Sequence, residues 1–147
     1  MVQPAIIGLD IGDKRIGVAV SDPLGLTAQA REVITRTTPE EDIAAIRALV
    51  TATKANRIVA GLPYSMDGTI GHQAQKVLAF IERLREGVDV RVETFDERMS
   101  TAAAKRSLSV TGARAKKRKQ VVDMVAAQHI LQTYLDRRSQ RPEQPQP

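Results

Sequence analysis

The chain has 147 residues, of which 42% are hydrophobic, so it can bury the core of one domain but not of two ordinary ones. Its formal charge of +5 favours an anionic partner, and an aromatic content of only 3% favours contact with phosphates over stacking on bases. The absence of cysteine excludes disulfides, thiolate nucleophiles and cysteine-bound zinc, and two histidines leave oxygen as the expected ligand of any metal.

The first half of the chain predicts three strands followed by a helix. Apolar or alternating runs predict the strands at residues 5–10, 16–20 and 29–34. The helix start is indicated by Thr38 as N-cap, Pro39 in the first turn and Glu41 as partner in a capping box. Apolar residues then recur at helical spacing to about residue 54.

The second half alternates strands with helices. Strands are predicted at residues 57–62 and 88–95, and helices at residues 72–85, from Ser100 or Thr101 to about residue 110, and at 118–138. Residues 111–117 are interpreted as a mobile basic loop. The order β-β-β-α-β-α-β-α-α predicts an α/β fold, with helices on both faces of a mixed sheet and functional loops at its carboxyl edge. Residues 1–138 form the predicted domain, and residues 139–147, rich in proline and glutamine, form a disordered tail.

Asp10 is the first unusual residue, because it lies within or at the end of the apolar run Ile-Ile-Gly-Leu-Asp-Ile-Gly. A buried carboxylate is costly unless it has a partner. Gly8 and Gly12 remove side chains two residues away on the same face of the strand, which leaves room beside Asp10. Asp10 is therefore a candidate ligand, with backbone hydrogen bonds in the following turn as the alternative.

Three acids late in the chain are candidates to join Asp10. Asp96 and Glu97 directly follow the predicted strand, and strand alternation sends their side chains to opposite faces. We choose Glu97, because Asp96 can instead cap the next turn, and a solvated charged turn is the alternative. Asp123 lies near the start of the last predicted helix, where an acid can simply complement the helix dipole. Its Val and Met neighbours favour an orientation toward the body of the protein.

A site formed by Asp10, Glu97 and Asp123 would contain hard oxygen ligands, which suit Mg²⁺ or Mn²⁺. Two such ions about 3.5–4 Å apart can activate a water and stabilise the leaving oxygen of a phosphodiester. The three residues are far apart in the sequence, so the fold has to gather them.

Four segments of the chain occur in a recognisable order. They are Gly-Leu-Asp-Ile-Gly-Asp-Lys-Arg-Ile-Gly-Val-Ala-Val-Ser-Asp at 8–22, Gly-Leu-Pro-Tyr-Ser-Met-Asp-Gly-Thr at 61–69, Asp-Glu-Arg-Met-Ser-Thr at 96–101 and Lys-Lys-Arg-Lys-Gln-Val-Val-Asp-Met-Val-Ala-Ala-Gln-His-Ile-Leu at 116–131. Together they resemble the YqgF/RuvX family of pre-16S rRNA nucleases, which are similar to Holliday junction resolvases. The resemblance implies an RNase H-like fold and a cytoplasmic, metal-dependent nuclease of ribosome biogenesis, with Asp10, Glu97 and Asp123 as its catalytic and metal-binding residues. Pre-rRNA is the implied substrate and branched DNA the second candidate.

Seven residues are candidate substrate contacts: Lys14, Arg15, Arg98, Thr101, Lys116, Lys117 and Lys119. Lys14 and Arg15 lie in the predicted turn after Asp10, where a solvated hairpin tip is the alternative. Arg98 and Thr101 precede or open a predicted helix, where backbone N–H groups favour an anion. Residues 98–119 carry eight basic side chains and no acidic one, which favours an electrostatic guide for nucleic acid over a solvated charge run.

Two other functions fit parts of the sequence. The Asp-Ile-Gly run followed by a hairpin also resembles the first phosphate loop of the ATP-binding actin and sugar-kinase superfamily, whose members close two such domains around the nucleotide. A non-catalytic RNA-binding factor of ribosome maturation is the third hypothesis. The chain shows no charged leader and no run of about 18 apolar residues, so no membrane partner is expected.

Overall fold

The computed structural model describes residues 2–65, 67–99 and 113–140, with the backbone alone at 113–120 and 140. Its elements are, in chain order, β1 (Ala5–Ile11), β2 (Arg15–Ser21), β3 (Ala28–Thr35), α1 (Pro39–Thr53), β4 (Ala55–Leu62), α2 (His72–Gly87), β5 (Arg91–Asp96), the 3-10 helix η1 (Glu97–Met99) and α4 (Ala113–Gln140). The short helix predicted near residues 100–110 lies outside the described residues.

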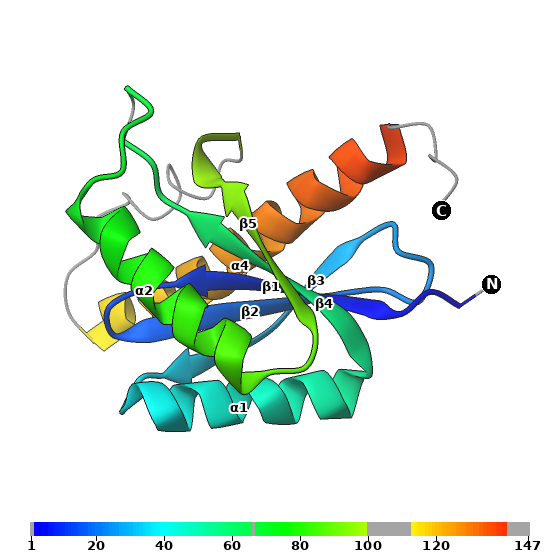
Figure 1. Cartoon of the computed structure of the whole chain (residues 1–147), viewed down its shortest axis with the longest axis horizontal. Helices are drawn as coiled ribbons and strands as arrows, with labels where there is room; N and C mark the ends of the chain where they lie inside the picture. The colour runs from blue at the N-terminus through cyan, green and yellow to red at the C-terminus, as the bar shows by residue number, and fades with distance from the viewer. Residues whose placement is uncertain (1, 66, 100–112, 141–147) are drawn as a thin grey trace.

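The strands form one mixed sheet in the order β3-β2-β1-β4-β5 (Figure 1). β1 and β2 form the predicted antiparallel hairpin, and β3 continues antiparallel to β2. β4 and β5 extend the sheet on the other side of β1, both parallel to it. The carboxyl ends of β1, β4 and β5 therefore meet at one edge, where ligand sites of α/β sheets usually form.

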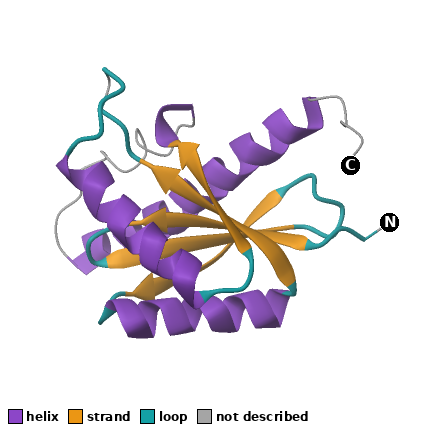
Figure 2. Cartoon of the chain, viewed as in Figure 1, coloured by secondary structure: helices purple, strands orange, loops and turns teal. Residues whose placement is uncertain are grey.

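Helices cover both faces of the sheet, α1 and α2 on one face and α4 on the other (Figure 2). Alternate residues of β1 point into the two separate cores, as expected for a strand. Leu9 packs in the core with α1 and α2, whereas Ile6 packs in the smaller core beneath α4. The predicted α/β architecture with helices on both faces is confirmed.

The start of α1 follows the predicted capping chemistry in part. Thr38 is the N-cap, and its hydroxyl accepts a hydrogen bond from the Glu41 backbone N–H. The Glu41 carboxylate accepts a hydrogen bond from the Thr37 hydroxyl, instead of completing the box at the Thr38 backbone. At the other end, Lys54 adopts the left-handed conformation with φ of 56°, which ends the helix and turns the chain directly into β4.

The boundary between α2 and β5 differs from the prediction. The helix α2 continues to Gly87, and the strand begins at Arg91, three residues later than residue 88. Val88 caps this helix by donating its backbone N–H to the Leu84 carbonyl oxygen at 3.1 Å. Asp89 follows it, and aspartate is disfavoured within strands.

The helix α4 is longer at both ends than predicted. It begins at Ala113, so residues 113–117 are helical and the predicted mobile loop at 111–117 is wrong for them. These residues are alanine, lysine and arginine, all strong helix formers. The helix also includes Ser139 and Gln140, which the sequence assigns to a disordered tail. Although α4 has 28 residues, no helix in the described part of the chain is both long and apolar enough to cross a membrane.

Candidate active site

Asp10 lies near the carboxyl end of β1, on the sheet face that α4 covers, and it is only 3% exposed. Its partner in the antiparallel ladder is Gly17 of β2. On the other side, the parallel register that pairs Leu9 with Ala60 brings Asp10 beside Gly61 of β4. Both neighbouring strands therefore present a glycine next to this carboxylate.

The space that these two cross-strand glycines leave is taken by α4 at Gly17 and by Ile130 and Glu97 at Gly61. Gly8 and Gly12, predicted to leave room beside Asp10, accommodate other groups. A Cβ atom on Gly8 would lie 2.7 Å from the Leu131 Cβ of α4, so Gly8 allows the helix to approach the strand. A Cβ atom on Gly12 would lie 2.9 Å from the Arg15 carbonyl oxygen, so Gly12 shapes the β1–β2 turn. Sequence spacing cannot reveal the cross-strand glycines, because they become neighbours of Asp10 only through the strand register.

Glu97 lies in η1, directly after β5, and is 2% exposed. Its Cγ atom is 3.3 Å from the position that a Cβ atom on Gly61 would occupy. Because the strand register also places Asp10 beside Gly61, both buried acidic residues are neighbours of this one glycine. Asp96 is the last residue of β5, and its carboxylate accepts hydrogen bonds from Arg98.

Asp123 lies on the side of α4 that faces the sheet. Ala127 and Ile130 follow it at helical spacing, and both are fully buried. A Cβ atom on Gly17 would be 2.0 Å from the Asp123 carbonyl oxygen, so the backbones of helix and strand are in direct contact. Since Gly17 pairs with Asp10, the backbone of Asp123 lies over the strand next to Asp10, and strands are about 5 Å apart.

Arg15, the first residue of β2, holds the side chain of Asp123. The Arg15 Nε donates to Asp123 Oδ2 at 2.9 Å, and the two side chains are 22% and 18% exposed. In Figure 1 the yellow start of α4 correspondingly lies beside the β1–β2 turn. Within the described residues, no three carboxylate or histidine side chains are placed to hold one metal ion. The fold thus brings the three predicted acids to one end of one face, but directs the Asp123 carboxylate to Arg15.

Asp10 and Glu97 are the kind of oxygen donors that a divalent cation prefers. Burial of a charged carboxylate is costly unless an opposite charge or a metal compensates it, and both residues are buried. Mg²⁺ is commonly bound through only one or two protein carboxylates, and Mn²⁺ also suits oxygen ligands. The donor set at this end of the sheet therefore fits a divalent metal ion.

Arg98 lies next to Glu97 and is engaged by Asp96. Asp96 accepts hydrogen bonds from the Arg98 backbone N–H and Nε, both at 3.0 Å, and from Nη2 at 2.6 Å. These bonds lower the pKa of the Asp96 carboxyl and raise the pKa of the Arg98 guanidinium. The Arg98 Cζ also lies 5.4 Å from the centre of the Tyr64 ring. Asp96 thus caps the turn that carries Glu97. Arg98 connects this turn to the loop after β4 through its contact with the Tyr64 ring.

Arg36 and Asp42 support the β1–β2 turn, a role that the sequence analysis missed. Asp42 is 2% exposed and accepts hydrogen bonds from Arg36 Nε and from the Thr37 backbone N–H, both at 3.0 Å. Arg36 Nη1 then donates to the Gly12 carbonyl oxygen at 2.8 Å. The pair fixes the turn that follows Asp10. The only sequence signal is an acid in the first turn of a helix, which usually means no more than a complement to the helix dipole.

The remaining predicted substrate contacts lie in different parts of the chain. Lys14 is exposed in the β1–β2 turn. Lys116, Lys117 and Lys119 belong to the first turns of α4, so they lie on a helix and not in a loop. Thr101 lies outside the described residues.

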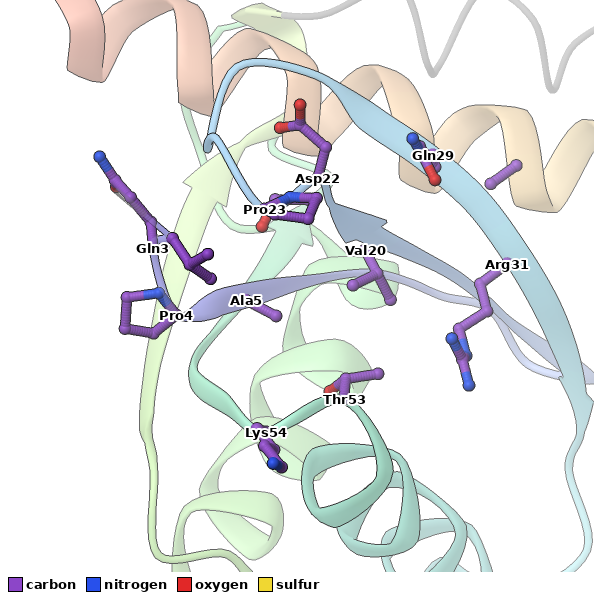
Figure 3. A pocket seen from close by; sticks show the side chains of 13 residues that line it. Gln3, Pro4, Ala5, Val20, Asp22, Pro23, Gln29, Arg31, Thr53 and Lys54 are labelled. Atoms are coloured by element: carbon purple, nitrogen blue, oxygen red, sulfur yellow. The ribbon is translucent and has the colours of Figure 1, made fainter.

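A cavity of about 640 Å³ lies at the opposite end of the sheet (Figure 3). Ala5 at the start of β1, Lys54 before β4 and Arg31 of β3 are among the residues that line it. Asp10 is five residues further along β1, roughly 16 Å at the rise of a strand. The described lining of the cavity includes none of the three predicted acids, so the cavity is separate from the candidate active site.

The family model of RuvX, described as a Holliday junction resolvase, matches residues 4–137. This chain belongs to the RuvX family. A protein from Desulforamulus reducens named "Putative pre-16S rRNA nuclease" is 50% identical over 131 residues, which cover 89% of this RuvX chain and 96% of the relative. A protein of the same name from Clostridioides difficile is 48% identical over 136 residues, with 92% and 96% covered.

Solved structures of resolvases share the fold of this RuvX chain. Thermus thermophilus RuvC in complex with a Holliday junction substrate gives a TM-score of 0.57 at 11% identity, over 94% of this chain and 98% of RuvC. The fowlpox virus resolvase in complex with Holliday junction DNA gives 0.50 at 11% identity, over 90% and 97%. These structures confirm the predicted RNase H-like fold. Family membership confirms the predicted enzyme class, a nuclease that hydrolyses phosphodiester bonds.

Proposed function

We propose that this RuvX protein cleaves pre-16S rRNA in the cytoplasm during ribosome biogenesis, using Mg²⁺ or Mn²⁺. The names of its relatives support this substrate. The observation that carries the metal-dependent chemistry is the pair of buried acidic residues, Asp10 and Glu97, that both neighbour Gly61 beneath α4. Asp123 is the third proposed ligand, because its backbone contacts Gly17, the residue opposite Asp10.

The residues around the site have distinct tasks in this mechanism. Asp10 and Glu97 would hold the metal, which when bound polarises the phosphate and lowers the pKa of a water nucleophile. Both carboxylates are buried, so solvent and salt screen their attraction for a cation less than at the surface. The exposed Lys14 in the β1–β2 turn and Arg15 at the start of β2 can contact the phosphates of the incoming strand. The basic start of α4 adds long-range attraction for the polyanion.

The substitution Asp10→Asn tests the proposed function, because it keeps the shape of the side chain and removes its charge. We expect Mn²⁺-dependent cleavage of a pre-16S rRNA fragment to be lost, while binding of the fragment in a filter or anisotropy assay persists. Asp89→Asn is the matched control, since it removes an exposed aspartate outside the site. Unchanged cleavage by Asp10→Asn would contradict the proposal. RNA binding without cleavage by the unmutated protein would favour the binding factor, and ATP binding would favour the kinase-like hypothesis.

Branched DNA is a second candidate substrate, favoured by the description of the matching family model. A matched set of RNA, duplex DNA and four-way-junction DNA, each tested with Mg²⁺ and Mn²⁺, compares the candidates directly. We expect the highest kcat/KM on RNA. Faster cleavage of the junction, lost again in Asp10→Asn, would reverse the choice of substrate and keep the assignment of the site.

A further inference from the structure

The Asp123 carboxylate is bound by Arg15, although the backbone of Asp123 lies at the candidate metal site. The bond from Arg15 Nε to Asp123 Oδ2 is 2.9 Å long. The carbonyl oxygen of Asp123 is fixed against Gly17 by direct backbone contact. The carboxylate can therefore change partners by rotation about its own side-chain bonds, without movement of α4. Such rotations of partly exposed side chains are fast.

Arg15 is accessible to a second anion while it holds Asp123. Its side chain is 22% exposed, and the neighbouring Lys14 is exposed in the same turn. The guanidinium fork of arginine binds carboxylate and phosphate groups with the same geometry. Partly exposed ion pairs contribute little to stability, so exchange of one anion for the other costs the fold little. A nucleic-acid phosphate at this turn would compete with Asp123 for Arg15.

We propose that Arg15 is a positioning residue that releases Asp123 to the metal site when it binds a phosphate of the substrate. This inference rests on the proposed function, because it assumes a metal near Asp10 and Glu97. Binding of nucleic acid then completes the ligand set, and the metal is held weakly until a substrate is present. Coupling of this kind is reciprocal, so metal binding must also strengthen nucleic-acid binding by the same factor.

Titration of Mn²⁺, followed by the electron paramagnetic resonance signal of the free ion, measures this coupling without catalysis. The probe is a short oligoribonucleotide that the protein does not cut during the titration. We expect it to raise the Mn²⁺ affinity of the unmutated protein about tenfold, within the usual range for coupled sites. The same oligonucleotide with uncharged methylphosphonate linkages should have no such effect, because it offers Arg15 no charged phosphate to bind.

Two variants of Arg15 test its role. Arg15→Gln should bind Mn²⁺ more tightly than the unmutated protein in the absence of oligonucleotide, and should lose the further increase on its addition. Arg15→Lys keeps the charge without the fork and should restore part of the coupling. Lys14→Gln removes the same charge from the same turn. It should weaken oligonucleotide binding and leave the Mn²⁺ affinity of the free protein nearly unchanged, which controls for a general effect of charge.

A double-mutant cycle decides whether Asp123 is the group that Arg15 controls. If it is, Arg15→Gln should increase Mn²⁺ affinity in the unmutated background and not in an Asp123→Asn background. An equal increase in both backgrounds, or none in either, would overturn the inference. If the unmutated protein binds no Mn²⁺ and cleaves no substrate, the proposed function fails as well. If it binds Mn²⁺ and cleaves, but its affinity does not respond to Arg15 or to the oligonucleotide, only the role of Arg15 fails.

Discussion

The two faces of the sheet differ in what they bury. Toward α1 and α2, alternate residues of β1 contribute branched aliphatic side chains to a continuous core, namely Ile7, Leu9 and Ile11. Toward α4, the same strand presents Ile6, Gly8 and Asp10, so the smaller core on that side ends at a buried carboxylate. Along β1, therefore, the side chains toward α1 and α2 are all apolar, whereas those toward α4 include a carboxylate near the end of the strand.

The second half of α4 is anchored by polar contacts at both edges of the sheet. At one edge, the Gln132 Oε1 accepts a hydrogen bond from the Ala28 backbone N–H at 2.8 Å. Toward β4 and β5, the Tyr134 hydroxyl accepts from Arg57 Nη1 at 2.6 Å and donates to Glu93 Oε2 at 2.9 Å. Among the described residues of its first half, Asp123 contacts the sheet through close backbone packing against Gly17 and through the ion pair with Arg15. Substitutions on the two faces should therefore separate stability from function.

Ile46→Ala should have the largest effect on stability. Ile46 of α1 is 0% exposed in the core with α2, and truncation would leave a cavity there. We expect a loss of about 4 kcal/mol in the free energy of unfolding by urea. Cleavage per folded molecule should not change, because Ile46 is on the face away from the carboxylates. A loss of cleavage larger than the loss of folded protein would contradict the separation of the two faces.

Gly17→Ala should have the next largest effect, and it should act on both properties. The new Cβ atom would lie 2.0 Å from the Asp123 carbonyl oxygen, so α4 must move away from β2. We expect a loss of about 3 kcal/mol, at the upper end for overpacking, and a fall in Mn²⁺ affinity through displacement of Asp123. Urea denaturation and Mn²⁺ titration measure the two effects. If the variant has the same free energy of unfolding as the unmutated protein, α4 does not pack against this glycine.

Tyr134→Phe should weaken the anchor of α4 while sparing the site. It removes the two hydrogen bonds to Arg57 and Glu93, and we expect a loss of about 1 kcal/mol in unfolding experiments. Burial raises the pKa of the Tyr134 phenol, so the neutral form is favoured in the folded state. This stability is present below the ordinary pKa of tyrosine, about 10, and is lost as the pH rises through the higher folded-state value. Tyr64→Phe, in the loop after β4, is the matched control and should leave that alkaline loss unchanged.

Much of the fold follows from local patterns in the sequence. The alternation of apolar residues predicts the strands, and Thr38 with Pro39 predicts the start of α1, because these signals depend on neighbours in the chain. Asp10 and Glu97 are also recognisable locally, as a charge inside an apolar run and an acid at a strand end. The start of α4 differs from the prediction because a run of basic residues is also typical of an exposed loop, although alanine, lysine and arginine favour helix.

The rest of the site depends on contacts that sequence spacing cannot express. Gly17 and Gly61 flank Asp10 only because of the strand register, which is a property of the whole sheet. The bond between Arg15 and Asp123 joins residues 108 positions apart. Each of these residues has an ordinary local explanation, as a strand glycine, a hairpin cation or a helix-dipole acid. Their combination becomes specific only when the helix lies on the sheet.

Asp96→Asn should have the smallest effect, and it tests whether the turn that carries Glu97 belongs to the functional face. Hydrogen bonds from Arg98 lower the pKa of Asp96, so the ionised carboxylate is favoured in the folded state. Its contribution to stability is present above the ordinary pKa of aspartate, about 3.9, and is lost as the pH falls through the lower folded-state value. The difference in stability between unmutated protein and variant, below about 1 kcal/mol near pH 7, should therefore shrink in acid.

If the Asp96 to Arg98 bonds also position Glu97, Mn²⁺ affinity at neutral pH should fall by more than this small change in stability predicts. An unchanged affinity would assign the pair to the stability of the turn alone, and Asp89→Asn supplies the comparison for removal of an acid outside it.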